Sequence, residues 1–156
     1  MEPKVTPIPK GYHAVTPYLC VNGGAAAIAF YKAAFAATEV SRLDMPDGRV
    51  GHAEVQIGDS RVMLSDEFPE VEFRSPRAIG GSPVMIHVYL EDVDATLASA
   101  LAAGAKQIRP LTDQFYGDRT TCIEDPFGHT WYLATRKENV SHEEMERRMK
   151  TMGAGT

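Results

Sequence analysis

The chain has 156 residues, of which 44% are hydrophobic and 24% are charged, and its formal net charge is −5. This length and apolar content suffice for one compact domain or for two small modules that share a core. A disordered chain would contain fewer apolar residues, and a protein whose main partner is nucleic acid normally presents a basic face. We therefore expect a folded protein that does not bind nucleic acid.

The N-terminal sequence and the cysteine content both favour a cytoplasmic location. MEPKVTPIPK contains three prolines and no apolar core, so it is not typical of a signal peptide, and no run of residues approaches membrane-spanning length. Cys20 and Cys122 are too few for a disulfide scaffold and too far apart in sequence for a zinc or redox pair. We expect no membrane partner, and we expect both cysteines to be reduced packing residues.

The first half of the chain predicts a strand, a helix and three further strands. Residues 13–21 have strand composition, Asn22-Gly23-Gly24 interrupts them, and residues 25–35 have the composition and period of a helix. Three short strand candidates follow, over residues 39–44, 52–57 and 61–65. We assign residues 11–66 to a first βαβββ module, which follows a Pro-rich arm over residues 1–10.

The second half of the chain repeats this pattern. Residues 67–83 are rich in Pro, Gly and charge and lack a clear period, which predicts a linker or a mobile flap. A strand is then predicted over 84–90 and a helix over 93–103, with Gly104 as its C-terminal cap. Three more strand candidates cover residues 106–111, 119–124 and 130–135. Residues 84–136 therefore form a second βαβββ module.

Residues 137–156 predict a C-terminal helix and tail. Ser141 and Glu144 have the spacing of a capping box ahead of the charged sequence HEEMERRMKTM. Three methionines share one side of this helix, at positions 145, 149 and 152. We expect the helix to pack on the body of the protein or on a second subunit, and a functional lid is the alternative.

Four motifs carry a resemblance to a known superfamily. They are HAEVQIGDSRVMLSDE (52–67), YGDR (116–119), DPFGHTWYLATR (125–136) and the tail motif ENVSHEEMERRM. The sequence resembles the vicinal oxygen chelate superfamily, which includes glyoxalases, fosfomycin-resistance and bleomycin-resistance proteins and extradiol dioxygenases, and within it the PhnB-like proteins. The resemblance implies an α+β fold in which two βαβββ modules form a curved, half-open mixed sheet. The helices would cover the convex face, and the site would lie on the concave face.

Alternation along the strands then predicts which side chains face the helices and which face the hollow. The set expected to face the helices is Val15, Leu19, Val21, Val62, Leu64, Ile86, Val88, Leu90, Trp131 and Leu133. The set expected to line the hollow is Ala14, Thr16, Tyr18, Cys20, Arg61, Met63, Ser65, Met85, His87, Tyr89, Thr130, Tyr132 and Ala134.

The resemblance also implies the loss of a metal site. In metal-dependent members of the superfamily, one residue from each of the first, fourth, fifth and eighth strands holds a divalent ion. Counting from the shared motifs places these positions at Thr16, Met63, Met85 and Tyr132. Thioethers are soft ligands and neutral hydroxyls are poor ones. We therefore expect no metal and no cofactor, and the DPFGH turn delivers a tyrosine where relatives deliver a glutamate.

A protein of this fold without the metal is expected to bind a small organic molecule, as the bleomycin-sequestering proteins do. Aromatic and thioether side chains suit planar or glycosylated ligands. The predicted ligand-binding residues are Thr16, Tyr18, His52, Glu54, Met63, Met85, His87, Tyr89, Arg119 and Tyr132. We also expect a homodimer, because an open sheet leaves strand edges that need covering.

Two alternatives remain open at this point. His52, Glu54 and His87, with Gln56 and His13 nearby, could form a shifted metal site or an acid/base pair. With His52, Glu54 or His87 as metal ligands, the protein would be a metal-dependent lyase, isomerase or dioxygenase. A purely structural protein with a filled hollow is the other alternative. Individual residues are also ambiguous: Arg119 could hold an anionic ligand or an ion pair, and His129 is expected to be a turn residue.

Overall fold

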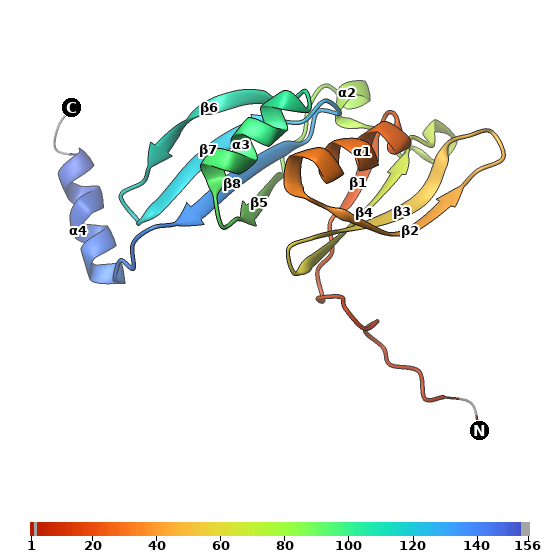
Figure 1. Ribbon diagram of the computed structural model, residues 1–156, viewed down its shortest axis with the longest axis horizontal. Coiled ribbons are helices and arrows are strands. Elements are labelled where there is room, and N and C mark those ends of the chain that lie inside the picture. Colours follow the sequence, from red (N-terminus) through yellow and green to blue (C-terminus); the bar gives the residue numbers. More distant parts are fainter. Residues whose placement is uncertain (2, 154–156) are drawn as a thin grey trace.

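The computed structural model describes residues 1 and 3–153 and contains two βαβββ modules (Figure 1). The first module consists of β1 (Tyr18–Val21), α1 (Gly24–Phe35), β2 (Thr38–Asp44), β3 (Val50–Ile57) and β4 (Ser60–Asp66). Its strands form a sheet in the order β1-β4-β3-β2, in which β1 and β4 are parallel and the other neighbours are antiparallel. The first predicted repeat is confirmed.

The second module repeats the same architecture. It consists of β5 (Met85–Tyr89), α3 (Val93–Ala102), β6 (Lys106–Asp113), β7 (Asp118–Glu124) and β8 (Thr130–Arg136). Its sheet has the order β5-β8-β7-β6, with β5 and β8 parallel. The described part of the chain also contains the helices η1 (Pro69–Val71), α2 (Pro76–Ile79) and α4 (His142–Gly153). The α+β fold with two βαβββ units is therefore as the sequence predicts.

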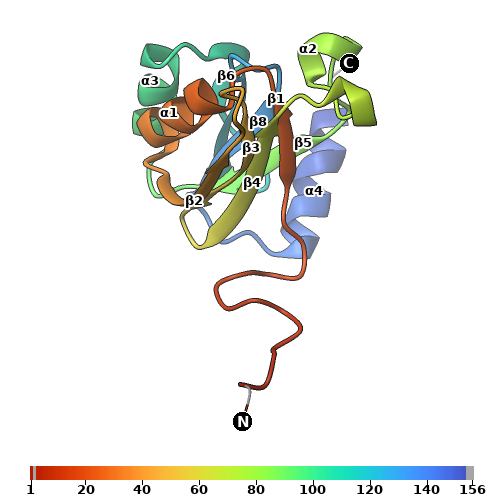
Figure 2. The same ribbon diagram turned by 90° about the vertical axis from the view of Figure 1, so that its right-hand side faces the viewer.

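The two modules lie side by side, and each forms its own mixed four-stranded sheet (Figure 1). Helices α1 and α3 pack against each other, and Figure 2 shows them together on one side of the sheets, with α2 and α4 on the other side. The face of each sheet that turns away from α1 and α3 is called its open face below. In the part of the chain that the structure describes, no helix is both long and apolar enough to cross a membrane.

The start of α1 depends on a close approach between the helix and the sheet. Gly24 has no Cβ, and one placed there would lie 2.7 Å from Val50 Cβ. The Asp66 carboxylate of β4 accepts hydrogen bonds from the backbone N–H groups of Gly23 (2.8 Å), Gly24 (2.9 Å) and Val50 (2.7 Å). Asp66 therefore caps the N-terminus of α1, a role that a residue next to the helix usually has, and it connects the helix to β3 and β4.

The predicted alternation holds for most of the set expected to face the helices, whereas Cys20, Ser65 and Ala134, which were expected to line the hollow, are buried. The buried side chains on the helix side are Leu19, Val21, Val62, Leu64, Trp131 and Leu133, and the partly buried ones are Ile86, Val88 and Leu90. Val15 was expected among them but is 86% exposed. Pro17 has no N–H to offer a neighbouring strand, and β1 begins only at Tyr18.

A buried carboxylate, Asp125, connects the two modules at the centre of the core. It accepts hydrogen bonds from the hydroxyl of Tyr31 in α1 (2.8 Å) and from Trp131 Nε1 in β8 (2.9 Å). It also accepts from the backbone N–H groups of Phe127 and His129, both at 2.9 Å, which closes the turn between β7 and β8. Burial, followed by the nearby charge of Asp125, raises the pKa of Tyr31 well above its usual value.

His129 makes a second connection between the modules. We expected it to be a turn residue, and it does lie in the turn between β7 and β8. Its ring also reaches the first module, where Nε2 lies 2.8 Å from the backbone carbonyl oxygen of Cys20 in β1. Asp125, rather than the His129 ring, caps the turn.

The linker between the modules has local structure that its composition did not reveal. Glu67 Oε1 accepts hydrogen bonds from the Ser75 hydroxyl (2.6 Å) and backbone N–H (2.8 Å), and these bonds lower the pKa of Glu67. Phe68 and Phe73 form an isolated bridge. The helices η1 and α2 are too short to produce a periodic pattern, which is why sequence periodicity could not find them.

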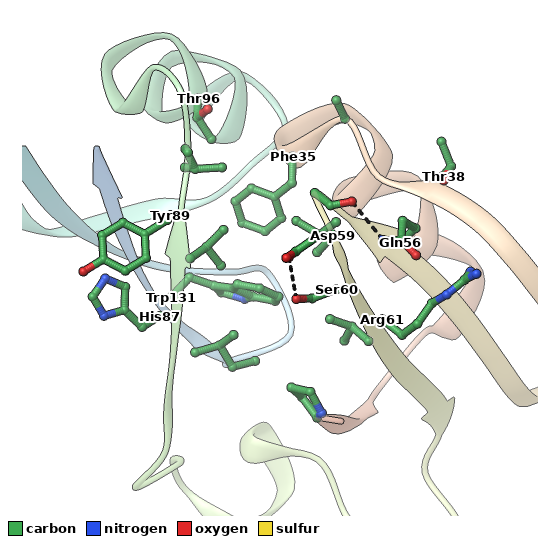
Figure 3. Close-up of a pocket in the computed structure, with 18 of the residues that line it drawn as sticks. Phe35, Thr38, Gln56, Asp59, Ser60, Arg61, His87, Tyr89, Thr96 and Trp131 are labelled. Carbon is green, nitrogen blue, oxygen red and sulfur yellow. Dashed lines mark hydrogen bonds between the residues drawn. The ribbon is translucent and has the colours of Figure 1, made fainter. Parts of the chain in front are cut away.

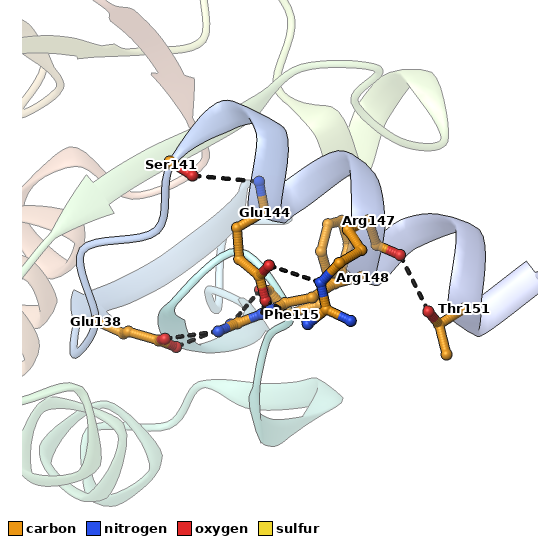
Figure 4. A network of polar contacts seen from close by, with 7 residues as sticks. All are labelled: Phe115, Glu138, Ser141, Glu144, Arg147, Arg148 and Thr151. Carbon is orange, nitrogen blue, oxygen red and sulfur yellow. Dashed lines mark hydrogen bonds and ion pairs between the residues drawn. The ribbon is translucent and has the colours of Figure 1, made fainter.

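Arg148 joins helix α4 to the second module and to the segment before the helix (Figure 4). Arg148 donates to the Phe115 carbonyl oxygen (2.9 Å) and pairs with Glu138 (2.7 Å) and Glu144 (2.7 Å). The Ser141 hydroxyl accepts from the Glu144 backbone N–H at 3.2 Å, which confirms the predicted N-terminal cap. The Glu144 side chain pairs with Arg147 and Arg148 and does not form the second hydrogen bond of a capping box, to the Ser141 backbone N–H. The methionine side of α4 is largely uncovered, with Met149 59% and Met152 62% exposed.

Replacement of Asp125 is expected to destabilise the protein strongly. In D125N, one carboxylate oxygen becomes an NH2 group that cannot accept hydrogen bonds from buried donors. We expect the free energy of unfolding, measured by urea denaturation, to fall by about 3 kcal/mol. D59N, in the exposed turn between β3 and β4, is the matched control and should change it by no more than about 0.5 kcal/mol. Equal effects of the two substitutions would show that Asp125 does not hold the modules together.

Both cysteines are expected to react slowly in the native protein. Cys20 and Cys122 are buried and form no disulfide. Burial, followed by the charges of Glu67 and Asp66, raises the pKa of Cys20 to about 11, and burial also raises the pKa of Cys122. At about pH 8 both groups are mainly thiols, so labelling by a thiol-disulfide reagent should be at least about tenfold slower than in urea-unfolded protein. Immediate labelling of the native protein would contradict this.

Candidate functional site

The open face of the first sheet carries a group of polar, aromatic and thioether side chains. Tyr18 on β1 lies opposite Met63 on β4, and Met63 lies opposite Glu54 on β3. His52 is two positions before Glu54 and therefore shares its face. The Tyr18 ring also packs edge-on against Phe73 of the linker, with 5.7 Å between ring centroids.

A chain of hydrogen bonds connects four of these side chains. The Tyr18 hydroxyl lies 2.9 Å from His52 Nδ1, and His52 Nε2 lies 3.1 Å from Glu54 Oε1. The hydroxyl of Tyr12, in the segment before β1, donates to Glu54 Oε2. The side chains of His52 and Glu54 are only 28% and 16% exposed. The imidazole is therefore held at both nitrogens.

Arg61 borders this group on β4. Its guanidinium lies over the Tyr12 ring, 5.6 Å from the ring centroid. Its Nε is buried and has no hydrogen-bond partner among the described residues. The segment around Tyr12 therefore covers one end of the open face.

The open face of the second sheet is aromatic. Met85, His87 and Tyr89 project from β5, and His87 lies opposite Tyr132 of β8. The His87 ring stacks on Tyr89 at 4.7 Å and meets Tyr132 edge-on at 5.1 Å. Tyr89, which is 66% exposed, donates to Asp118 at 3.2 Å.

Hydroxyl groups form the polar part of this second face. The Tyr132 hydroxyl lies 2.9 Å from the Tyr116 hydroxyl and donates to Thr120 Oγ1 at 3.1 Å. Gln114 Nε2 donates to the same Thr120 oxygen at 2.9 Å. Burial and the hydrogen bond to Tyr132 raise the pKa of Tyr116. The Tyr116 hydroxyl therefore stays protonated at ordinary pH, and it shares a hydrogen bond with the Tyr132 hydroxyl.

The residues present do not fit the superfamily's divalent ion. Thr16 precedes β1, and Met85 lies opposite Thr130 rather than Tyr132. The cross-strand neighbours on the two open faces are instead Tyr18 with Met63 and His87 with Tyr132. These two pairs contain one imidazole and no carboxylate. Within residues 1 and 3–153, no three His, Cys, Asp or Glu side chains are grouped as a metal site would require.

Arg119 is a predicted site residue that the structure places elsewhere. Arg119 is on β7, where it lies opposite Thr135 of β8. It is three positions from Cys122, the partner of Tyr132, and therefore points to the opposite face of the sheet. Its guanidinium pairs with Asp94 of α3 (2.8 Å) and Asp113 of β6 (3.1 Å). Of the predicted site residues, Tyr18, His52, Glu54 and Met63 share the open face of the first sheet, and Met85, His87, Tyr89 and Tyr132 share that of the second. Thr16 precedes β1, and Arg119 faces the helices.

A cleft of about 1120 Å³ opens between the modules. Figure 3 shows Phe35 and Trp131 between β5 and the turn at Asp59 and Ser60. The apolar side chains in its lining include Phe35, Ile57, Val62, Ile86, Val88 and Trp131. Thr16 borders it, and so do His87 and Tyr89. Sequence patterns could not reveal this cleft, because it arises from the way one module lies against the other.

Tyr12 and Phe73 are site residues that sequence reasoning missed. Both contact the open face of the first sheet from segments outside the strands. Alternation assigns faces only within a strand, so it says nothing of such residues. Tyr116 had a weak signal, because it belongs to the YGDR motif.

Comparison with known proteins agrees with this architecture. The Glyoxalase/Bleomycin resistance protein/Dioxygenase superfamily matches residues 12–133. An uncharacterized protein of Mycobacterium tuberculosis is 41% identical over 145 residues, which cover 91% of this chain and 85% of that protein. The solved structure of a gene product from Arabidopsis thaliana has a TM-score of 0.63 and 27% identity, and the match covers 79% of this chain and 98% of that one.

A PhnB protein has the same fold. The structure of the PhnB protein from Bacillus cereus matches with a TM-score of 0.62 and 19% identity, over 79% of this chain and 99% of that one. Three observations point to the same superfamily: the paired βαβββ modules, the DPFGH turn and the family match over residues 12–133. The chain belongs to the Glyoxalase/Bleomycin resistance protein/Dioxygenase superfamily.

Proposed function

We propose that this protein binds a small organic molecule at the open faces of its sheets and uses no resident metal ion. The observation that carries the proposal is the cross-strand register, which pairs Tyr18 with Met63 and His87 with Tyr132. Aromatic rings and thioethers at these places offer stacking and dispersion contacts.

Exposure of the aromatic side chains supports the same proposal. Tyr18 is 45%, Met85 48% and Tyr89 66% exposed. Large apolar side chains that are grouped and exposed often mark a binding surface. The hydroxyls of Tyr116 and Tyr132 and the imidazole of His87 add polar groups that would orient a planar or glycosylated ligand.

The protein is also proposed to act as a homodimer. Strands β1, β2, β5 and β6 are sheet edges. Helix α4, whose Met149 and Met152 are exposed, lies on the same side of the sheets as the open faces (Figure 2). A second copy that covers these surfaces would enclose the aromatic groups and exclude water from a bound ligand.

An enzyme is the second candidate, and the hydrogen-bonded His52 and Glu54 favour it. The expected alternative is a metal-dependent lyase, isomerase or dioxygenase that uses His52, Glu54 or His87 in place of the usual ligands. A shifted site built from all three would require these side chains to share an ion. His87 belongs to the second open face, where it packs with Tyr89 and Tyr132. The His52–Glu54 pair is more consistent with proton transfer than with metal binding.

Ligand binding is expected to stabilise the folded protein, whereas divalent ions are not expected to change its stability. A thermal-shift screen would include planar aromatic compounds, glycosylated antibiotics, and Mn²⁺, Ni²⁺ and Zn²⁺. A ligand at one hundred times its Kd adds about 2.7 kcal/mol to the free energy of unfolding, which is a readily measured rise in Tm. Retention of one divalent ion per chain after dialysis would contradict the proposal and favour the metal-dependent enzyme.

Substitutions on the open face should weaken binding of any compound that the screen finds. Y132A removes a ring and a hydroxyl from the second face, and we expect the Kd measured by calorimetry to rise about tenfold or more. R119Q is the matched control, because Arg119 faces the helices, and its Kd should stay unchanged. A higher Kd in R119Q, with no change of Kd in Y132A, would show that the ligand does not bind at the second open face.

Loss of the apolar side of α4 should disrupt the proposed dimer. In M149E/M152E, two exposed methionines become carboxylates, which oppose burial in an interface. We expect light scattering after size exclusion to show twice the chain mass for the wild type and the chain mass for this variant. K150E changes an exposed residue of the same helix and should remain dimeric. A monomeric wild type would refute the dimer directly.

A further inference from the structure

Tyr18, His52 and Glu54 are arranged as a nucleophile, a base and a residue that orients the base. Their functional atoms form one chain, with 2.9 Å between the Tyr18 hydroxyl and His52 Nδ1 and 3.1 Å between His52 Nε2 and Glu54 Oε1. Such a chain is the general signature of an activated side-chain nucleophile. The same arrangement recurs with serine or cysteine as the nucleophile on unrelated folds.

The partners of the imidazole determine which nitrogen carries the proton. A carboxylate only accepts hydrogen bonds, so the nitrogen that faces Glu54, Nε2, must be the donor. In the neutral ring Nδ1 then has a free lone pair, and it accepts the proton of the Tyr18 hydroxyl. The hydroxyl proton of Tyr18 therefore points at a base.

Tyr12 holds the carboxylate in this orientation. Its hydroxyl donates to Glu54 Oε2, so Oε1 stays directed at the imidazole. The side chains of Glu54 and His52 are mostly covered, whereas Tyr18 is 45% exposed. The orienting groups are thus shielded from water, and the group at the end of the chain is open to a reactant.

We infer that Tyr18 is a nucleophile, activated by His52 and Glu54, whose substrates are small molecules with an activated acyl group. The phenolic oxygen would attack the acyl carbon, a bond between oxygen and carbon would form, and the bond from that carbon to the leaving group would break. The phenol proton passes to His52 and then to the leaving group. The step requires neither an oxidant nor a metal, and it does not depend on the ligand of the proposed binding function.

The test uses N-acetylimidazole as the acyl donor on the full-length protein at neutral pH. Mass spectrometry of proteolytic fragments would give the acetylation rate of each tyrosine. In H52Q, the glutamine can still accept a hydrogen bond from Tyr18 but cannot take up its proton. We expect the acetylation rate of Tyr18 to fall about tenfold in H52Q, and to fall also in E54Q, which loses the orienting carboxylate.

Two tyrosines in the same molecule serve as internal references. Tyr89 is exposed and donates to Asp118 instead of to an imidazole, so its rate should be the same in all variants. Tyr31 is buried in the core, and its acetylation would report unfolding. H142Q makes the same substitution at an exposed histidine of α4 and should leave the Tyr18 rate at the wild-type value.

An unchanged Tyr18 rate in H52Q would overturn the inference. If H52Q exposes Tyr31, E54Q becomes the deciding variant, and its Tyr18 rate either falls, as inferred, or stays unchanged, which refutes the inference. A screen that finds no stabilising ligand would count against the proposed binding function and leave the acetylation result untouched. Failure of one proposal is therefore distinguishable from failure of the other.

Discussion

The fold depends on one buried carboxylate that serves both modules. Asp125 closes the turn between β7 and β8, accepts from Trp131 in the core, and reaches Tyr31 in α1 of the first module. Each donor would otherwise be buried without a partner, which is more costly than the net gain from any single hydrogen bond. Helices α1 and α3 also pack against each other, so this contact and the Asp125 hydrogen bonds together join the two modules.

The fold was largely predictable from sequence, because its repeats are local and periodic. The buried residues Val62 and Leu64 follow the alternation of a half-buried strand, and the same holds for Trp131 and Leu133. The role of Asp125 could not be predicted in this way. Its partner Tyr31 lies 94 positions away in sequence, and no local pattern records a contact over that separation.

The candidate site was predictable only where it lies on strands. Tyr18, Met63 and Tyr132 follow from alternation once the superfamily's concave face is assumed. Arg119 was assigned to the site through its motif, although its phase matches Ile123, which is buried on the helix side. The contribution of Tyr12 depends on where an irregular segment crosses the sheet, and that path is set by tertiary contacts.

The two open faces occupy equivalent places in a duplicated architecture, yet their chemistry differs. The first carries an imidazole bonded to a carboxylate, and the second carries linked phenols. This difference breaks the internal pseudo-twofold symmetry at the level of donors and acceptors. A molecule that contacts both faces would place its acidic groups on the imidazole of the first face and its hydrogen-bond acceptors on the phenols of the second. Only one orientation of the molecule satisfies both requirements. Divergence of the repeats thus supplies directionality, a property that two identical modules would lack.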